Sequence, residues 1–145
     1  IADINTARYN ISGCGTTTNA MINNGRPPSS SGLTESWNGT SWTELADLNS
    51  GRYSTGISGA GPSTQAIVFS GYNPPNSSGM ANTEEWNGTS WAEVADLATA
   101  RYSPANGTIG TAVAAICAVG QPLPVASTAT EEWGAGKAAQ TFTDS

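Results

Sequence analysis

The apolar residues of this chain gather in short runs that are separated by turn residues. The runs at 65–69 and 111–119 are apolar without clean alternation, which is typical of strands buried on both faces. A glycine closes each run, at Gly71 and Gly120, and Gly25 closes the equivalent run near the N-terminus. Proline, glycine and β-branched residues interrupt every candidate helix. The pattern therefore predicts an all-β chain.

Asn-Gly dipeptides at 38–39 and 87–88 indicate two β-hairpins. With a two-residue type I′ turn at 87–88, Trp86 would lie opposite Thr89. Alternation along each strand then puts two Trp side chains on one face of each hairpin. The shared faces carry Trp86, Trp91 and Glu93 in one hairpin, and Trp37, Trp42 and Glu44 in the other.

A sheet face with two Trp side chains needs a cover, and a neighbouring unit is the natural one. The opposite face of the second hairpin, which carries Thr83 and Glu85, is expected to be more solvated. Pro- and Ser-rich stretches at 26–32, 73–79 and 121–128 are expected to be loops. They differ in length and composition on a repeated frame, and binding usually resides in such loops.

Two sequence markers recur in the same order along the chain. A Thr-Glu-x-Trp marker ends at Trp37, Trp86 and Trp133, and an Arg-Tyr marker begins at Arg8, Arg52 and Arg101. The repeat length, roughly 45 to 50 residues, is typical of propeller blades. We therefore expect one domain over residues 1–145 with three units, 1–45, 46–94 and 95–145, each of about four strands.

These units resemble kelch repeats. The likeness rests on the Arg of Ala-Arg-Tyr, the apolar strand ending in Gly, and the later aromatic pair ending in Trp. It implies kelch-like β-propeller blades, that is, three four-stranded antiparallel blades. The double glycine of the family is reduced to one here, and the third unit lacks its second Trp. The sequence Thr-Glu-Glu-Trp-Asn-Gly-Thr-Ser-Trp is similar to kelch-like repeats of marine bacteriophage structural proteins, and this resemblance implies a virion appendage.

Three blades are few for a closed ring, since propellers typically use four to eight. Three arrangements would resolve this. Two chains could close a six-bladed ring, more blades could precede Ile1, or the blades could stack on other subunits in a fibre.

Composition excludes several classes of chemistry. The chain has 145 residues, no His and a net charge of −6. Without His it cannot build Ser-His-Asp or Cys-His catalysis, nor the copper site of the kelch-type enzyme galactose oxidase. The acidic balance argues against a nucleic-acid partner, and the longest apolar run is too short to span a membrane. We expect no enzyme, no metal and no cofactor.

The repeated residues each have a structural and a functional interpretation. Arg8, Arg52 and Arg101 could bind an anion around a central channel, but bonds to backbone carbonyls or a nearby Glu are preferred. Asp3, Asp47 and Asp96 could bind calcium, but a turn role is preferred. Trp37, Trp86 and Trp133 are expected to pack between blades. The candidates for contact with a ligand or partner are Trp42, Trp91 and Tyr72.

Two further features leave alternatives open. Cys14 and Cys117 are either buried thiols or a disulfide. Glycosylation motifs begin at Asn10, Asn38, Asn76, Asn87 and Asn106, and turn chemistry explains them equally well.

The expected function is a non-enzymatic structural module of a phage tail or related appendage, located in the virion or outside the cell. The alternatives are a carbohydrate- or receptor-binding module for host attachment and a subunit of an extracellular filament. The expected partners are further copies of the chain, other virion subunits or a cell-surface glycan.

Overall fold

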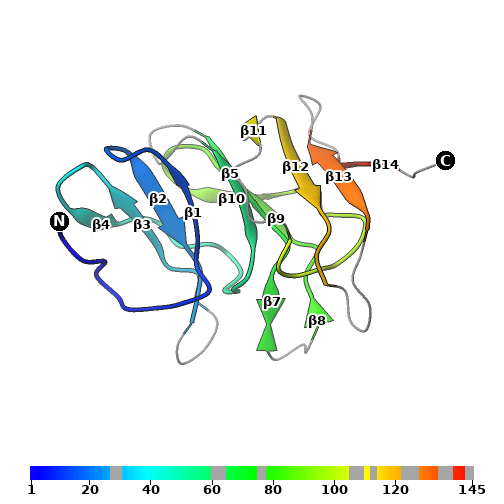
Figure 1. Cartoon of the computed structure of the whole chain (residues 1–145), viewed down its shortest axis with the longest axis horizontal. Helices are drawn as coiled ribbons and strands as arrows, with labels where there is room; N and C mark the ends of the chain where they lie inside the picture. Colours follow the sequence, from blue (N-terminus) through cyan, green and yellow to red (C-terminus); the bar gives the residue numbers. More distant parts are fainter. Residues whose placement is uncertain are drawn as a thin grey trace.

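Four-stranded antiparallel sheets make up the frame of the molecule (Figure 1). The computed structural model describes residues 1–26, 31–59, 65–74, 78–104, 110–111, 114–121, 128–133 and 139–142. In these ranges the chain forms β-strands and no α-helix. The predicted all-β class is confirmed.

Each repeat unit folds into one sheet, and a short ladder joins the second unit. The first sheet has the order β1 (Ser12–Gly15), β2 (Ala20–Asn23), β3 (Thr34–Trp37), β4 (Trp42–Glu44). The second has the order β5 (Gly56–Gly59), β6 (Ala66–Phe69), β9 (Thr83–Trp86), β10 (Trp91–Val94). The third has the order β11 (Gly110–Thr111), β12 (Ala114–Ala118), β13 (Thr130–Trp133), β14 (Ala139–Phe142). The extra ladder pairs β7 (Tyr72–Asn73) with β8 (Ser78–Gly79).

The sheets follow one another in chain order, and their innermost strands meet, because β5 contacts both β1 and β11. The four-stranded antiparallel unit is confirmed, including its fourth strand in the third repeat. There Ala139 lies opposite Trp133, where the other two hairpins have a second Trp.

The register of the Trp hairpins differs from the prediction. Trp86 lies directly opposite Trp91, and a four-residue loop joins the strands. The Asn87 side chain causes this, since its Oδ1 accepts hydrogen bonds from the N–H groups of Thr89 (2.9 Å) and Ser90 (3.0 Å). The faces are nevertheless as predicted, because opposite residues point to the same side and the difference amounts to two residues.

The Trp-bearing faces of the second and third sheets pack on the preceding sheet, as predicted, whereas the Trp37–Trp42 face of the first sheet has no preceding sheet in the described residues. Between the first and second sheets, Trp86 and Trp91 join Cys14, Met21 and Leu48 in one buried cluster. Between the second and third sheets, Trp133 stacks on Phe69, with ring centroids 6.3 Å apart and planes at 9°. Burial of these aromatic side chains is the main apolar contact between neighbouring sheets.

Two burial predictions are wrong because burial depends on whether a neighbouring sheet covers that face of the strand. Thr83 was expected to be solvated but is fully buried, because the third sheet covers its face of the second sheet. The run at 111–119 was expected to be buried on both faces, whereas β12 alternates between buried and exposed residues. No further sheet of the described residues covers its outer face. In contrast, β6 lies between two sheets and is buried along its whole length.

The three predicted loops lie only partly in the described ranges. Residues 73–79 contain the β7–β8 ladder, a correction to the loop prediction, and residues 75–77 lie outside the described ranges. Residues 27–30 and 122–127 also lie outside them, as do the motif positions Asn76 and Asn106.

No disulfide joins Cys14 and Cys117, which are buried in the two different clusters. Burial raises the pKa of the Cys117 thiol to about 11, although the nearby Arg101 charge opposes this shift. Within the part of the chain that the structure describes, no helix has the length and apolar character needed to cross a membrane.

Candidate functional site

The three repeated arginines bind carboxylates inside the fold. Arg52 pairs with Glu84 at 2.7 Å, and both side chains are fully buried. Arg8 pairs with Glu35, and Arg101 pairs with Glu131, in the same arrangement. Each arginine also donates to backbone carbonyls, as Arg101 does to Ala129 O at 2.8 Å. The bonds to backbone carbonyls and to a nearby Glu, which the structural interpretation predicts, are thus present in all three units.

The buried glutamates tie the segment entering each blade to its third strand. Glu84 accepts hydrogen bonds from the Asn49 backbone N–H (2.7 Å) and the Asn49 side-chain amide (2.9 Å). Glu131 and Glu35 accept equivalent backbone N–H bonds from Ala98 and Asn5. The Glu of each Thr-Glu-x-Trp marker recurs together with the Arg of each Arg-Tyr marker, so this pairing was visible in the sequence.

Burial and pairing act against each other on the ionisation of these groups. Burial alone would raise the pKa of Glu35, but hydrogen bonds from Arg8 and from the Asn5 backbone outweigh it and lower the pKa. Burial lowers the pKa of Arg52, and the Glu84 charge opposes this effect. The carboxylates of Glu35, Glu84 and Glu131 are therefore each bound in a buried ion pair with an arginine.

Two of the repeated aspartates bind the start of a third strand, which differs from the predicted turn role. Asp47 Oδ1 accepts the Thr34 N–H at 3.3 Å, and Asp96 Oδ1 accepts the Thr83 N–H at 3.2 Å. Asp3 is exposed in the N-terminal segment. Among the described residues, no three His, Cys, Asp or Glu side chains are grouped as they would be to hold a metal ion.

The repeated glycines are needed by the backbone. Gly25, Gly71 and Gly120 have φ values of 114°, 127° and 115°, a region that side chains disfavour. A Cβ at Gly71 would lie 2.9 Å from Arg52 Cδ and 2.7 Å from Thr55 Cγ2. Each of these glycines therefore lets the backbone pass close to the buried arginine of the same unit.

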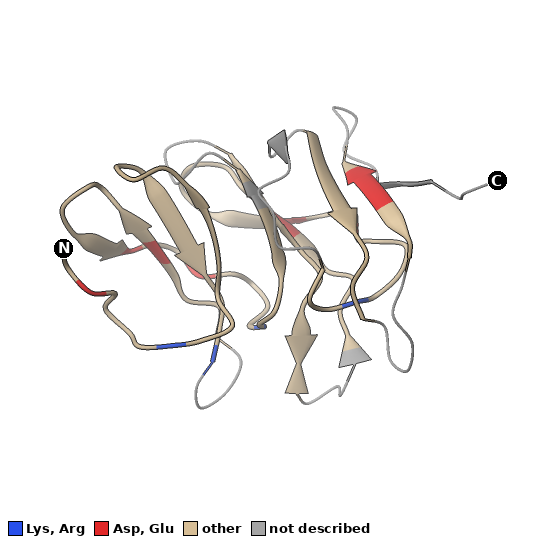
Figure 2. Cartoon of the chain, in the orientation of Figure 1, with Lys and Arg blue, Asp and Glu red and all other residues tan. Residues whose placement is uncertain are grey.

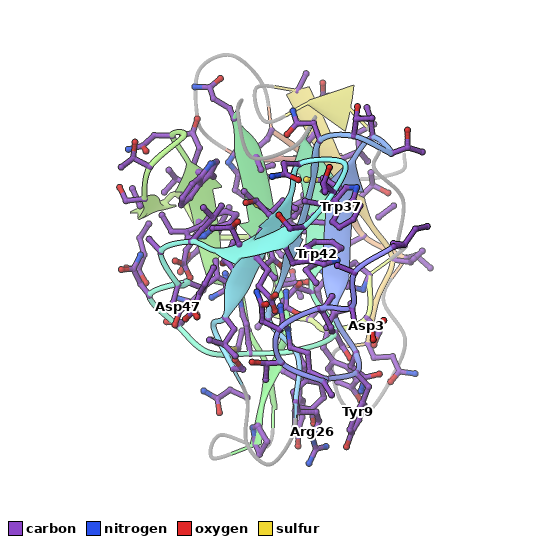
Figure 3. All side chains as sticks on the ribbon, turned by 90° about the vertical axis from the view of Figure 1, so that its left-hand side faces the viewer. Asp3, Tyr9, Arg26, Trp37, Trp42 and Asp47 are labelled. Atoms are coloured by element: carbon purple, nitrogen blue, oxygen red, sulfur yellow. The ribbon has the colours of Figure 1, made fainter. Side chains whose placement is uncertain are left out.

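The Trp side chains separate into two groups. Trp86 and Trp133 are buried between sheets, as expected for inter-blade packing. Trp37 is buried as well, but it lies beside Trp42 on a face that no other sheet of the described residues covers, so the inter-blade prediction is wrong for Trp37. Trp91 is buried as well, and its Nε1 donates to Thr34 Oγ1 of the first sheet at 3.2 Å, so its candidacy as an exposed contact is wrong. Trp42 remains half-buried beside Trp37, with ring centroids 5.3 Å apart, on the side of the molecule that faces the viewer in Figure 3.

The outer sheets present two end faces. The N-terminal end face carries Ala20, Ile22, Trp37 and Trp42, and the C-terminal end face carries Ala114, Ile116, Ala118 and Glu132. At the equivalent positions inside the molecule a neighbouring sheet covers the side chains, and the end faces lack this cover. Met21 and Ile67 are 0% and 1% exposed where another sheet follows, whereas Ile116 at the same repeat position is 38% exposed.

All four tyrosines of the chain lie in one row, which we call the tyrosine row. Paired backbone segments bring each Tyr of an Arg-Tyr marker opposite the residue after a repeated glycine. In the first two units that residue, Arg26 or Tyr72, also contacts the tyrosine of the next blade. Along the row the members are Tyr9, Arg26, Tyr53, Tyr72, Tyr102 and Gln121.

The contacts along the row are continuous. The Arg26 guanidinium lies 5.8 Å from the Tyr9 ring centroid and 4.9 Å from that of Tyr53. Tyr72 lies 5.4 Å from Tyr53 and 5.3 Å from Tyr102, centroid to centroid. Only Tyr72 of this row was predicted as a contact. The recurrence of Tyr in each Arg-Tyr marker was a signal for the rest.

Comparisons with known proteins identify the fold but no family. No protein-family model matches the chain, and no curated protein matches it by sequence. The solved structure of YjhT is similar, with a TM-score of 0.74 and 12% sequence identity, and the match covers 94% of this chain and 46% of that one. The chain thus spans less than half the length of YjhT, and at this identity the likeness shows the fold alone.

Proposed function

We propose that this chain is a non-enzymatic structural module of a virion appendage that assembles with a second copy of itself through its two end faces. The observation that carries the proposal is the exposure of Ile116, in contrast to burial of Met21 and Ile67 at the equivalent positions. The contact between blades occurs twice among the described residues, and each end face offers one half of it.

The two end faces are complementary in kind. Inside the chain, a Trp-bearing face packs on an apolar β2-type or β6-type strand of the preceding sheet. The N-terminal end face offers the Trp37–Trp42 pair, and the C-terminal end face offers Ile116 and its neighbours. Such a contact is head-to-tail, and it either closes into a ring of chains or continues as a filament.

The non-enzymatic role and the virion setting rest on different arguments. The three buried glutamates are bound to arginines, so they are withheld from acid–base chemistry, and the chain has no His. The virion setting rests on the resemblance of the repeat to marine bacteriophage structural proteins. An antibody raised against the chain should label an appendage on purified phage particles, and labelling confined to host cells would overturn this setting.

Sedimentation velocity over a range of concentrations tests the assembly. The 145-residue chain should form dimers or larger species, and Ile116→Asp should shift it to monomer. Thr89→Asp is the control, because Thr89 is exposed in the β9–β10 loop of the middle sheet, which forms neither end face. A parent chain that stays monomeric, or equal disruption by both variants, would overturn the proposal.

A further inference from the structure

We propose that the tyrosine row binds a neutral oligosaccharide laid along it, from Tyr9 across the blades toward Gln121. This site is separate from both end faces, so it adds an activity that assembly does not require. The starting observation is that all four tyrosines of the chain are in this one row, and none is fully buried.

The row offers the two kinds of contact that a sugar ring needs. A pyranose has an apolar C–H face that packs on an aromatic ring, and a rim of hydroxyl groups that exchange hydrogen bonds. Tyrosine supplies an apolar ring and a polar hydroxyl in one rigid side chain. Tyr9 is 53% exposed at the start of the row, and Gln121 presents an exposed carboxamide at its other end.

Arg26 differs from the repeated arginines. Arg8, Arg52 and Arg101 each pair with a buried glutamate, whereas the Arg26 guanidinium lies over the rings of Tyr9 and Tyr53. Its Nη1 donates to the Tyr53 hydroxyl at 3.3 Å, and its Nε has no hydrogen-bond partner among the described residues. The Nε atom is buried, so the donors left for the hydroxyl groups of a ligand are the remaining Nη N–H groups.

The charge of the molecule favours a neutral ligand over a polyanion. With a net charge of −6, the protein repels chains of negative charge, and one guanidinium in the row offsets little of this. A protein partner is also a poorer match, because a stable interface buries about 800 Å² on each partner. The row is a single file of side chains, which suits an extended saccharide chain.

The row lies on the same side of the molecule as the β7–β8 ladder. Figure 3 shows Tyr9 and Arg26 together at the lower end of the molecule. The β7–β8 ladder begins with Tyr72 and projects from the same side in Figure 1. Figure 2 shows the Arg segments of the described chain toward this lower side, with the acidic segments mostly above them. A saccharide on the row would thus lie on the side of the molecule that carries the β7–β8 ladder.

Isothermal titration calorimetry with the 145-residue chain tests the inference. The probes are four neutral hexasaccharides (from cellulose, laminarin, chitin and mannan) and one anionic hexasaccharide from alginate. At least one neutral probe should bind, and Tyr9→Ala should weaken that binding about tenfold or more, since an exposed ring that stacks on a sugar is lost. Arg26→Gln should weaken it as well.

Two controls separate binding from folding. Tyr9→Phe keeps the ring and should retain affinity within about threefold, and Ile116→Asp alters an end face and should leave affinity unchanged. Circular dichroism of each variant checks that it is folded. The inference would be overturned by a folded parent that binds no neutral probe at millimolar concentration. Stronger binding of the alginate probe, or full affinity in Tyr9→Ala, would overturn it as well.

Discussion

Each blade depends on one buried ion pair between residues that are far apart in sequence. Arg101 and Glu131 are both fully buried, and Arg101 donates further bonds to the carbonyls of Thr99, Val119 and Ala129. Removing one partner of such a pair leaves an uncompensated charge in the interior, which costs more than the intact pair contributes. The pair therefore specifies how the entering segment docks on the sheet.

Glu131→Gln should lower the free energy of unfolding by about 3 to 5 kcal/mol, because it leaves the Arg101 guanidinium buried without a counter-charge. Glu132→Gln is the matched control, since Glu132 is the next residue, points to the opposite face and is exposed. It should change stability by about 0.5 kcal/mol or less. Urea denaturation of both variants measures the difference, and equal effects would contradict the buried pair.

At the scale of the element, the Trp hairpin is the unit that joins one blade to the next. The pair Trp86–Trp91 is directly cross-strand, with ring centroids 5.4 Å apart, and it buries its face against Cys14 and Met21 of the first sheet. The pair Trp37–Trp42 has nearly the same internal geometry, at 5.3 Å. The hairpins thus differ mainly in whether a sheet of the described chain lies in front of them.

This difference makes a prediction for matched substitutions in the two hairpins. Trp86→Ala should destabilise the fold by about 3 to 5 kcal/mol, because it empties a fully buried site between two sheets. Trp42→Ala should cost the monomer about 1 kcal/mol, because Trp42 is half-buried on an end face. Thermal or urea unfolding measures both, and a loss below about 1 kcal/mol for Trp86→Ala would contradict the blade packing.

At the scale of the whole molecule, the same repeat position has different surroundings in different blades. Ile67 lies between the second and third sheets, whereas Ile116 occupies the equivalent place on the C-terminal end face. The stacking order of the sheets sets this contrast, since the strands themselves pair alike, with Ile67 opposite Glu85 and Ile116 opposite Glu132.

Ile67→Asp should therefore prevent stable folding, because it buries a carboxylate without a partner between two sheets. Ile116→Asp should leave the monomer folded, with a loss of about 1 kcal/mol or less, because the new charge reaches water. Circular dichroism spectra and unfolding midpoints of the two variants check this. Similar losses of stability at both positions would contradict the end-face assignment.

Local patterns in the sequence were enough for the elements and the repeat. The apolar runs with their closing glycines, together with the two markers, predicted three four-stranded units and the faces of the Trp hairpins. They failed for the hairpin register, because the Asn87 side chain binds two backbone N–H groups and opens the turn to four residues. A dipeptide signal cannot distinguish this loop from a type I′ turn.

The sequence by itself determined the strand frame, since period, turn residues and repeated markers act over short distances along the chain. It also indicated that each repeated arginine has a structural partner. Only the tertiary structure decided which faces are covered, because burial of Trp91, Thr83 and Ile116 depends on the neighbouring sheet rather than on the strand. The tyrosine row has the same origin: its members come from different blades, and the stacking of those blades brings them into contact.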